Sequence, residues 1–271
     1  MGLGLVAIFV ALGAAVGFLA GLLGIGGGMT IVPVLVAAFT HEAFPLQHVV
    51  PMAIGTAAAT IVFTSLSSAR AHHAAGAVDW HIVRAMAPGL VVGSLVGPQV
   101  AAAVPWRLMA AIFALFTWFT ALRMMRPAAA APMAARKLPG TAALFGVGTG
   151  VGVISGMLGA GGAFLTVPFM TRCNVPIHAA VATSAALGMP IAVAATIGFV
   201  AAGYGQAGLP TYSLGYVYLP ALAAIVAASM LSAPFGARTA HAWPVAKLRR
   251  AFGALMAMLG AYMAWWAFVG R

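Results

Sequence analysis

The stretch GLLGIGGGMTIVP, residues 21–33, decides how the first part of the chain folds, because it places five glycines among thirteen uncharged residues. Glycine disfavours a helix interior by about 1 kcal/mol relative to alanine. The residues on both sides nevertheless have the composition of membrane helices. The stretch therefore predicts a helix that ends near residue 23, a break, and a short second helix.

The whole chain has the composition of an integral membrane protein. Of its 271 residues, 63% are hydrophobic and 6% are charged, whereas soluble domains contain about 25% charged residues. The longest run without Asp, Glu, Lys or Arg spans residues 173–237. A helical crossing needs about 20 apolar residues, and the alternation typical of barrel strands is not visible. The predicted fold class is an all-α polytopic membrane protein in contact with the lipid bilayer.

Charge and cysteine content exclude other classes. A net charge of +11 can indicate nucleic-acid binding, but the basic residues lie in loops between apolar segments. Membrane orientation explains that distribution better than nucleic-acid binding. Cys173 is the single cysteine, so no disulfide framework or cysteine metal cluster is expected. The sequence predicts no nucleic-acid partner, no metal and no cofactor.

Ten hydrophobic segments follow from the hydropathy pattern. The second and seventh are too short to span as straight helices, and each directly follows a glycine-rich break. The segments are 2–23, 29–39, 48–69, 80–102, 107–125, 139–158, 163–171, 178–202, 213–235 and 250–269.

An internal repeat relates the two breaks. Residues 13–33 align with residues 148–168 at a constant offset of 135, with ten identities in 21 positions. Such self-similarity indicates a duplicated unit. The predicted organisation is transmembrane repeat 1 (1–125), a cytoplasmic linker (126–138) and transmembrane repeat 2 (139–271).

Basic residues set the orientation of the two repeats. Arg136 and Lys137 place the linker inside, and Lys247, Arg249 and Arg250 place the loop before the last segment inside. Both loops are inside only if an even number of crossings separates them. Segments six to nine supply four crossings if the short seventh segment also crosses. Each repeat then has five crossings, so the two repeats insert in opposite senses. This is the inverted-repeat arrangement of secondary transporters. Both termini are then periplasmic in a bacterial inner membrane. The alternative has eight crossings, with the two short segments re-entrant.

The two motifs together resemble a known family. GLLGIGGGMTIVP and SGMLGAGGAFLTVP (155–168) each open one half of the chain. In this they are similar to the TauE/SafE family of bacterial membrane permeases, named for sulfite and sulfoacetate export. The resemblance covers nearly the whole chain. It implies a secondary transporter, in the export direction, of small sulfur-containing anions such as sulfite or organosulfonates. One departure between the halves is that Gly28 corresponds to Ala163.

The physics of a broken helix agrees with an anion as ligand. The break leaves backbone amides free at the start of the following helix, where the helix dipole is positive. Glycine lets an anion approach those amides closely. Two breaks in inverted copies would meet near the midplane of the membrane. Close helix packing through small residues is the alternative explanation of the same glycines.

The predicted substrate site combines both breaks with hydroxyls from the third segment of each repeat. Thr56 and the pair Thr183-Ser184 lie at matching places and could donate hydrogen bonds to an oxyanion or help to bind a coupling cation. Bonding to their own helix carbonyls is the structural alternative. The predicted substrate-binding residues are Gly24, Gly26, Gly27, Gly28, Met29, Thr30, Thr56, Gly159, Gly161, Gly162, Ala163, Phe164, Thr183 and Ser184.

The energy source stays open at this level. Glu42 and Asp79 are the only acidic residues, and both fall at predicted loop edges. No carboxylate is therefore expected at mid-membrane as a proton relay. A coupling proton or a sodium ion, and a homo-oligomer, are all compatible with the sequence.

Other functions share part of this pattern. An anion channel uses the same site physics without alternating access, and a non-transporting membrane scaffold would not require two broken helices. An intramembrane enzyme is not expected, because the chain contains no HExxH or GxSxG motif and no acid pair in an apolar segment.

Overall fold

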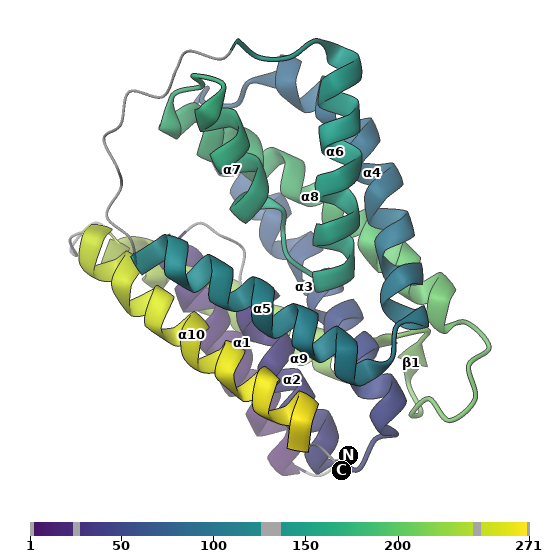
Figure 1. Ribbon diagram of the computed structural model, residues 1–271. Helices are drawn as coiled ribbons and strands as arrows, with labels where there is room; N and C mark the ends of the chain where they lie inside the picture. Colours follow the sequence, from purple (N-terminus) through teal and green to yellow (C-terminus); the bar gives the residue numbers. More distant parts are fainter. Residues whose placement is uncertain (1–2, 24–27, 126–136, 241–244, 270–271) are drawn as a thin grey trace.

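The computed structural model describes residues 3–23, 28–125, 137–240 and 245–269. Within these ranges the chain forms ten α-helices and one small β-hairpin (Figure 1). The helices are α1 (Leu3–Leu23), α2 (Gly28–His41), α3 (Leu46–Ala74), α4 (Trp80–Ala103), α5 (Trp106–Met125), α6 (Thr141–Leu158), α7 (Ala163–Arg172), α8 (Ile177–Gly203), α9 (Leu219–Ala240) and α10 (Val245–Val269).

The helices confirm the predicted fold class. Six helices in the described part of the chain are long and apolar enough to cross a membrane, namely α3, α4, α5, α6, α8 and most of α10. The two short segments are α2, with 14 residues, and α7, with 10. At 1.5 Å per residue these helices are about 21 Å and 15 Å long, less than the roughly 30 Å hydrocarbon core. The chain is therefore an α-helical polytopic membrane protein.

The β-hairpin is the element that hydropathy missed. Residues 213–235 were predicted as one hydrophobic segment, but α9 begins only at Leu219. Before it, β1 (Ser213–Leu214) pairs antiparallel with β2 (Val217–Tyr218). The turn needs glycine, because Gly215 has a φ of +54° and a Cβ there would overlap the carbonyl of Val200.

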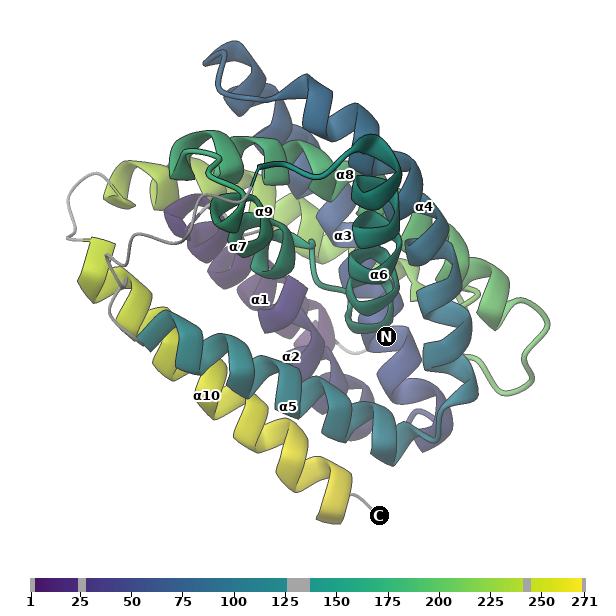
Figure 2. The same ribbon diagram turned by 45° about the horizontal axis from the view of Figure 1, so that its top comes forward.

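The most extensive helix contacts follow a pattern that is kept when the first five helices are exchanged with the last five. α1 packs along α9, and its counterpart α6 packs along α4. α3 packs against α8, and α5 packs against α10, so these pairs map onto themselves. Figures 1 and 2 both show α5 and α10 side by side, and α10 also contacts α2. Contacts of this kind are what a duplicated unit produces.

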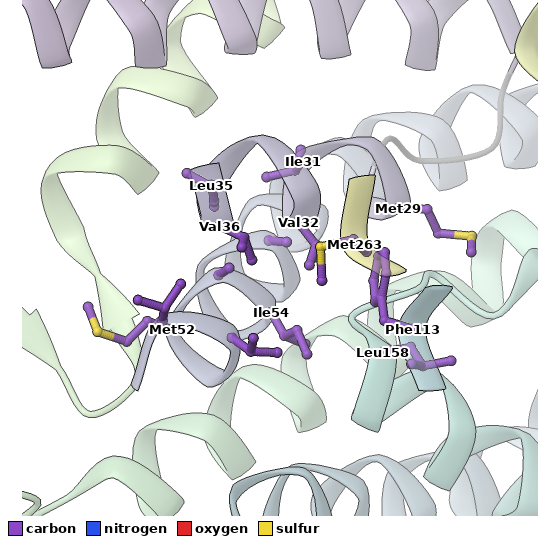
Figure 3. Close-up of a cluster of buried hydrophobic side chains, with 14 of the residues drawn as sticks. Met29, Ile31, Val32, Leu35, Val36, Met52, Ile54, Phe113, Leu158 and Met263 are labelled. Atoms are coloured by element: carbon purple, nitrogen blue, oxygen red, sulfur yellow. The ribbon is translucent and has the colours of Figure 1, made fainter. Parts of the chain in front are cut away.

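Buried apolar side chains form two clusters of unequal size. The large cluster joins α2 to α3, α5, α9 and α10, with Phe39, Phe113 and Tyr218 among its members. Figure 3 shows part of it, with Val32 and Val36 of α2 on the side toward Ile54 of α3. The small cluster joins α4, α6, α7 and α8, and it includes no described residue of α5 or α10. The α5–α10 pair thus closes over one side of the bundle.

Candidate functional site

The second glycine break has a backbone that glycine alone adopts readily. Gly159 ends α6 with a φ of +60°, and Gly162 precedes α7 with a φ of +74°. Both values are in the left-handed region, which costs residues with a Cβ free energy. These two glycines allow the chain to leave α6 and begin α7 within a four-residue loop.

The start of α7 carries amides that no helix carbonyl satisfies. The amide of Thr166 donates to the carbonyl of Gly162 at 2.9 Å. The amides of Gly161, Ala163 and Phe164, by contrast, have no backbone acceptor within the described residues. They lie at the positive end of the helix dipole. This set of donors suits an anion.

The start of α2 lies directly against this loop. A Cβ on Gly28 would overlap the carbonyl oxygen of Gly159 and the Cδ1 of Ile61. Gly28 therefore needs to be glycine for close approach, and it brings the two breaks into contact. Three residues of the predicted site, Gly24, Gly26 and Gly27, lie outside the described residues.

A narrow pocket lies beside the same loop. Its walls come from α3 and α8, and in this conformation it is too narrow to hold a water molecule. Ser155, in the last turn of α6, also lines the pocket. Its hydroxyl is buried and has no hydrogen-bond partner in the described part of the chain.

Thr56 and Thr183 make contacts other than the predicted ones. Thr56 Oγ1 accepts a hydrogen bond from the amide of Tyr218 at 3.0 Å, in the last residue of β2, directly before α9. Thr183 Oγ1 accepts one from the amide of Asp79 at 2.9 Å, at the start of α4. Each threonine thus attaches its helix to the fourth helix of the other half. Substrate contact by these two hydroxyls stays a prediction.

Ser184 does lie next to the second break. Its Oγ is 2.6 Å from Oγ1 of Thr166, and the Thr166 hydroxyl donates to the carbonyl of Gly162 at 3.1 Å. Both hydroxyls are buried. Thr166 was absent from the predicted set, although a lone hydroxyl one turn beyond Gly162 was a usable signal.

The remaining predicted residues flank the breaks. Met29 and Thr30 are buried in the first turn of α2, and Met29 belongs to the large cluster (Figure 3). Ala163 and Phe164 are half-buried in the first turn of α7. Ser155 was missed by the sequence reasoning. The signal was a hydroxyl four residues before Gly159, close to the glycine break.

The two acidic residues lie in other places. Asp79 caps α4, where its carboxylate accepts the amides of His81 and Ile82 at 3.0 Å and 3.2 Å. Glu42 is exposed just after α2. Burial raises the pKa of the Tyr218 phenol, and the nearby charge of Glu42 raises it further. Among the described residues, no three His, Cys, Asp or Glu side chains gather as metal ligands.

Comparison with known proteins places the chain among membrane transporters. The family described as "Sulfite exporter TauE/SafE" matches residues 9–263. A protein of Haemophilus influenzae named "Probable membrane transporter protein" is 34% identical over 251 residues, covering 93% of this chain and 95% of the relative. A similarly named protein of Bacillus subtilis is 25% identical, covering 90% and 94% of the two chains. One of Methanocaldococcus jannaschii is 24% identical, covering 96% and 95%. No solved structure matches the chain.

Proposed function

The chain belongs to the TauE/SafE family of membrane transporters, and from this premise we propose that it is a secondary transporter exporting small sulfur-containing anions such as sulfite or organosulfonates. The observation that carries this proposal is the meeting of the two glycine breaks. Gly28 lies against the carbonyl of Gly159, beside the unsatisfied amides at the start of α7. The substrate binds at these paired breaks.

The charge of the molecule supports an anion over a cation. The whole chain contains two acidic residues against thirteen lysines and arginines. One acid caps α4 and the other lies near Tyr218, so neither lines the pocket. Backbone amides and hydroxyls are then the polar groups available to a ligand, and amides donate hydrogen bonds.

The repeat architecture supports secondary transport. Residues 1–125 and 139–271 form two inverted repeats joined by a cytoplasmic linker, residues 126–138, in a bacterial inner membrane with both termini periplasmic. The exchange pattern of the helix pairs is compatible with this duplication. Inverted repeats permit alternating access, because each half can adopt the conformation of the other.

The unequal clusters favour a transporter over a channel. The large cluster closes the bundle around α2, whereas the small cluster lacks α5 and α10 and leaves most of α7 only half-buried. A channel needs a pathway that is open on both sides at once. A site closed on one side fits alternating access.

Counterflow in proteoliposomes tests the proposal. Vesicles preloaded with unlabelled sulfite should take up labelled sulfite faster than empty vesicles, and the initial rate should saturate. Uptake that is linear in concentration and independent of preloading would indicate a channel. No sulfite or organosulfonate flux above that of protein-free vesicles would indicate a scaffold.

A further inference from the structure

Ser155 is a buried polar group that the fold itself does not use. The side chain is 1% exposed, and its hydroxyl has no hydrogen-bond partner among the described residues. A serine in a helix ordinarily satisfies its hydroxyl by donating to a carbonyl of the preceding turn, and other buried hydroxyls here do so, as Thr117 does with Phe113 at 2.8 Å. An unpaired buried hydroxyl destabilises the fold. Such a group is available to a ligand.

The hydroxyl lies beside the donors of the second break. It lines the pocket together with Gly161, and it is 3.6 Å from the position that a Cβ would occupy on Gly162. The amide of Gly161 has no backbone acceptor in the described part of the chain, and the amide of Ala163 follows in the first turn of α7. A hydroxyl on α6 and the loop residue Gly161, whose amide has no backbone acceptor among the described residues, therefore line the same small pocket.

The opposite walls of the pocket are apolar. Ala58 and Ile61 come from α3, and Ile191 and Ala195 come from α8. These side chains offer no hydrogen bond, and an anion oxygen placed against them would lose its hydration without compensation. The pocket therefore has one face that donates hydrogen bonds and one that does not.

We propose that Ser155 donates a hydrogen bond to an oxygen of the transported anion, with the amide of Gly161, while the apolar wall of α3 and α8 receives the side of the anion without oxygen. This inference rests on the proposed function and assigns the recognition to particular residues. It selects oxyanions with one oxygen-free side. Sulfite presents the sulfur lone pair there and an organosulfonate presents carbon, whereas sulfate presents oxygen on every side and is rejected.

The repeat alignment indicates that only the second half of the chain supplies this hydroxyl. At the offset of 135, Ser155 corresponds to Ala20, which has no hydroxyl. The pocket is also too narrow for water in the described conformation, so a bound anion requires the side chain of Ile61 or Ile191 to move. Shortening Ile191 should then ease entry of organosulfonates with longer carbon chains.

The test compares Ser155→Ala with a matched control in reconstituted full-length protein. Ser94 of α4 is equally buried, and its hydroxyl donates to the carbonyl of Gly152 at 3.2 Å. Gly152 lies in α6, the helix that also contains Ser155. Ser155→Ala should raise the KM for sulfite counterflow by about tenfold, the value of one lost hydrogen bond to a charged group. Ser94→Ala should leave that KM within about twofold of wild type, since its bond is internal to the protein.

Two further measurements keep the outcomes distinct. Sulfite should raise the Tm of the detergent-purified wild type and of Ser94→Ala, but much less that of Ser155→Ala. Excess unlabelled sulfate should compete poorly with sulfite in the wild type. An unchanged KM and Tm shift in Ser155→Ala, or equal competition by sulfate, would overturn the inference and leave the proposed function intact. Absence of saturable exchange in the wild type would instead remove the proposed function itself.

Discussion

The two short helices that follow the glycine breaks have related sequences and different surroundings. Ten of the 14 residues of α2 are buried, against two of the 10 residues of α7. α2 contacts α3 and α10, whereas α7 makes its main contacts, among the described helices, with α8. Equivalent positions in a repeat thus do not receive equivalent packing. The α5–α10 pair decides the difference, because it belongs to the cluster around α2.

In the proposed transport cycle, the unequal burial of α2 and α7 corresponds to one of two access states. Inverted repeats reach the second state when each half takes the packing of the other. α7 would then become enclosed, and α2 would lose the cover of α5 and α10.

The largest expected effect is in cysteine labelling at equivalent positions. Val32 of α2 is 0% exposed, and Val167, its counterpart in α7, is half-buried. In a Cys173→Ser background, Val167→Cys should react with a water-soluble maleimide at least about tenfold faster than Val32→Cys, because a buried site reacts only when the structure opens. Equal rates would contradict the asymmetry. Mass spectrometry of timed reactions provides the measurement.

The next effect concerns the residue in which the two breaks differ. Gly28→Ala should lower the free energy of unfolding by about 1–3 kcal/mol, because the new methyl overlaps the carbonyl of Gly159 and the side chain of Ile61. The reciprocal change Ala163→Gly should cost about 1 kcal/mol or less, through backbone entropy alone. Thermal unfolding in detergent compares the two. Similar losses would mean that Gly28 is not a close-packing position.

A smaller and symmetric effect is expected from the two threonines. Thr56→Val and Thr183→Val each leave one backbone amide, of Tyr218 or of Asp79, without its acceptor. Each should destabilise the protein by about 1–3 kcal/mol at most, by similar amounts. An additional rise in the KM for sulfite would support the predicted substrate contact of these hydroxyls, and unchanged stability would contradict the structural role of the two bonds.

The smallest effect is expected from an arginine at the end of α7. The charge of Arg172 acts on that of Arg123, near the end of α5, so two cations lie close together on the α7 side. Arg172→Gln should slow sulfite entry from that side by about twofold at low salt, and less at high salt, because exposed charges are screened. Arg107→Gln, at the start of α5, serves as the control. Equal effects of both changes would argue against steering by Arg172.

Much of the fold could be predicted because its causes are local. Apolar runs of helix length predicted the ten helices with ends within about six residues of those observed, and the glycine pattern predicted the breaks. The β-hairpin escaped because two-residue strands carry no periodic pattern. The partners of Thr56 and Thr183 escaped because those amides lie 162 and 104 residues away. The unequal packing of α2 and α7 could not be read from a repeat, since repeated sequence predicts equivalence.

The candidate site was predictable in kind and less so in detail. The glycine pattern identified the loop between Gly159 and Gly162, where positive φ angles do require glycine. Ser155 and Thr166 were missed because a single hydroxyl in a helix is usually bonded to its own backbone. Their roles depend on which side of the helix faces the loop, and that follows from packing between α3, α6 and α8.

Binding of labelled sulfite to a variant with an altered pocket tests whether the transported anion binds beside the second glycine break. Gly161 lines the pocket, has no positive φ, and would place a Cβ no closer than 3.8 Å to Ile61. Gly161→Ala should therefore fold, place a methyl group in the pocket and strongly weaken saturable binding. Gly150→Ala, where a Cβ meets nothing within 4 Å, should bind sulfite as the wild type does. Wild-type binding by a folded Gly161→Ala protein would contradict binding of the anion in this pocket.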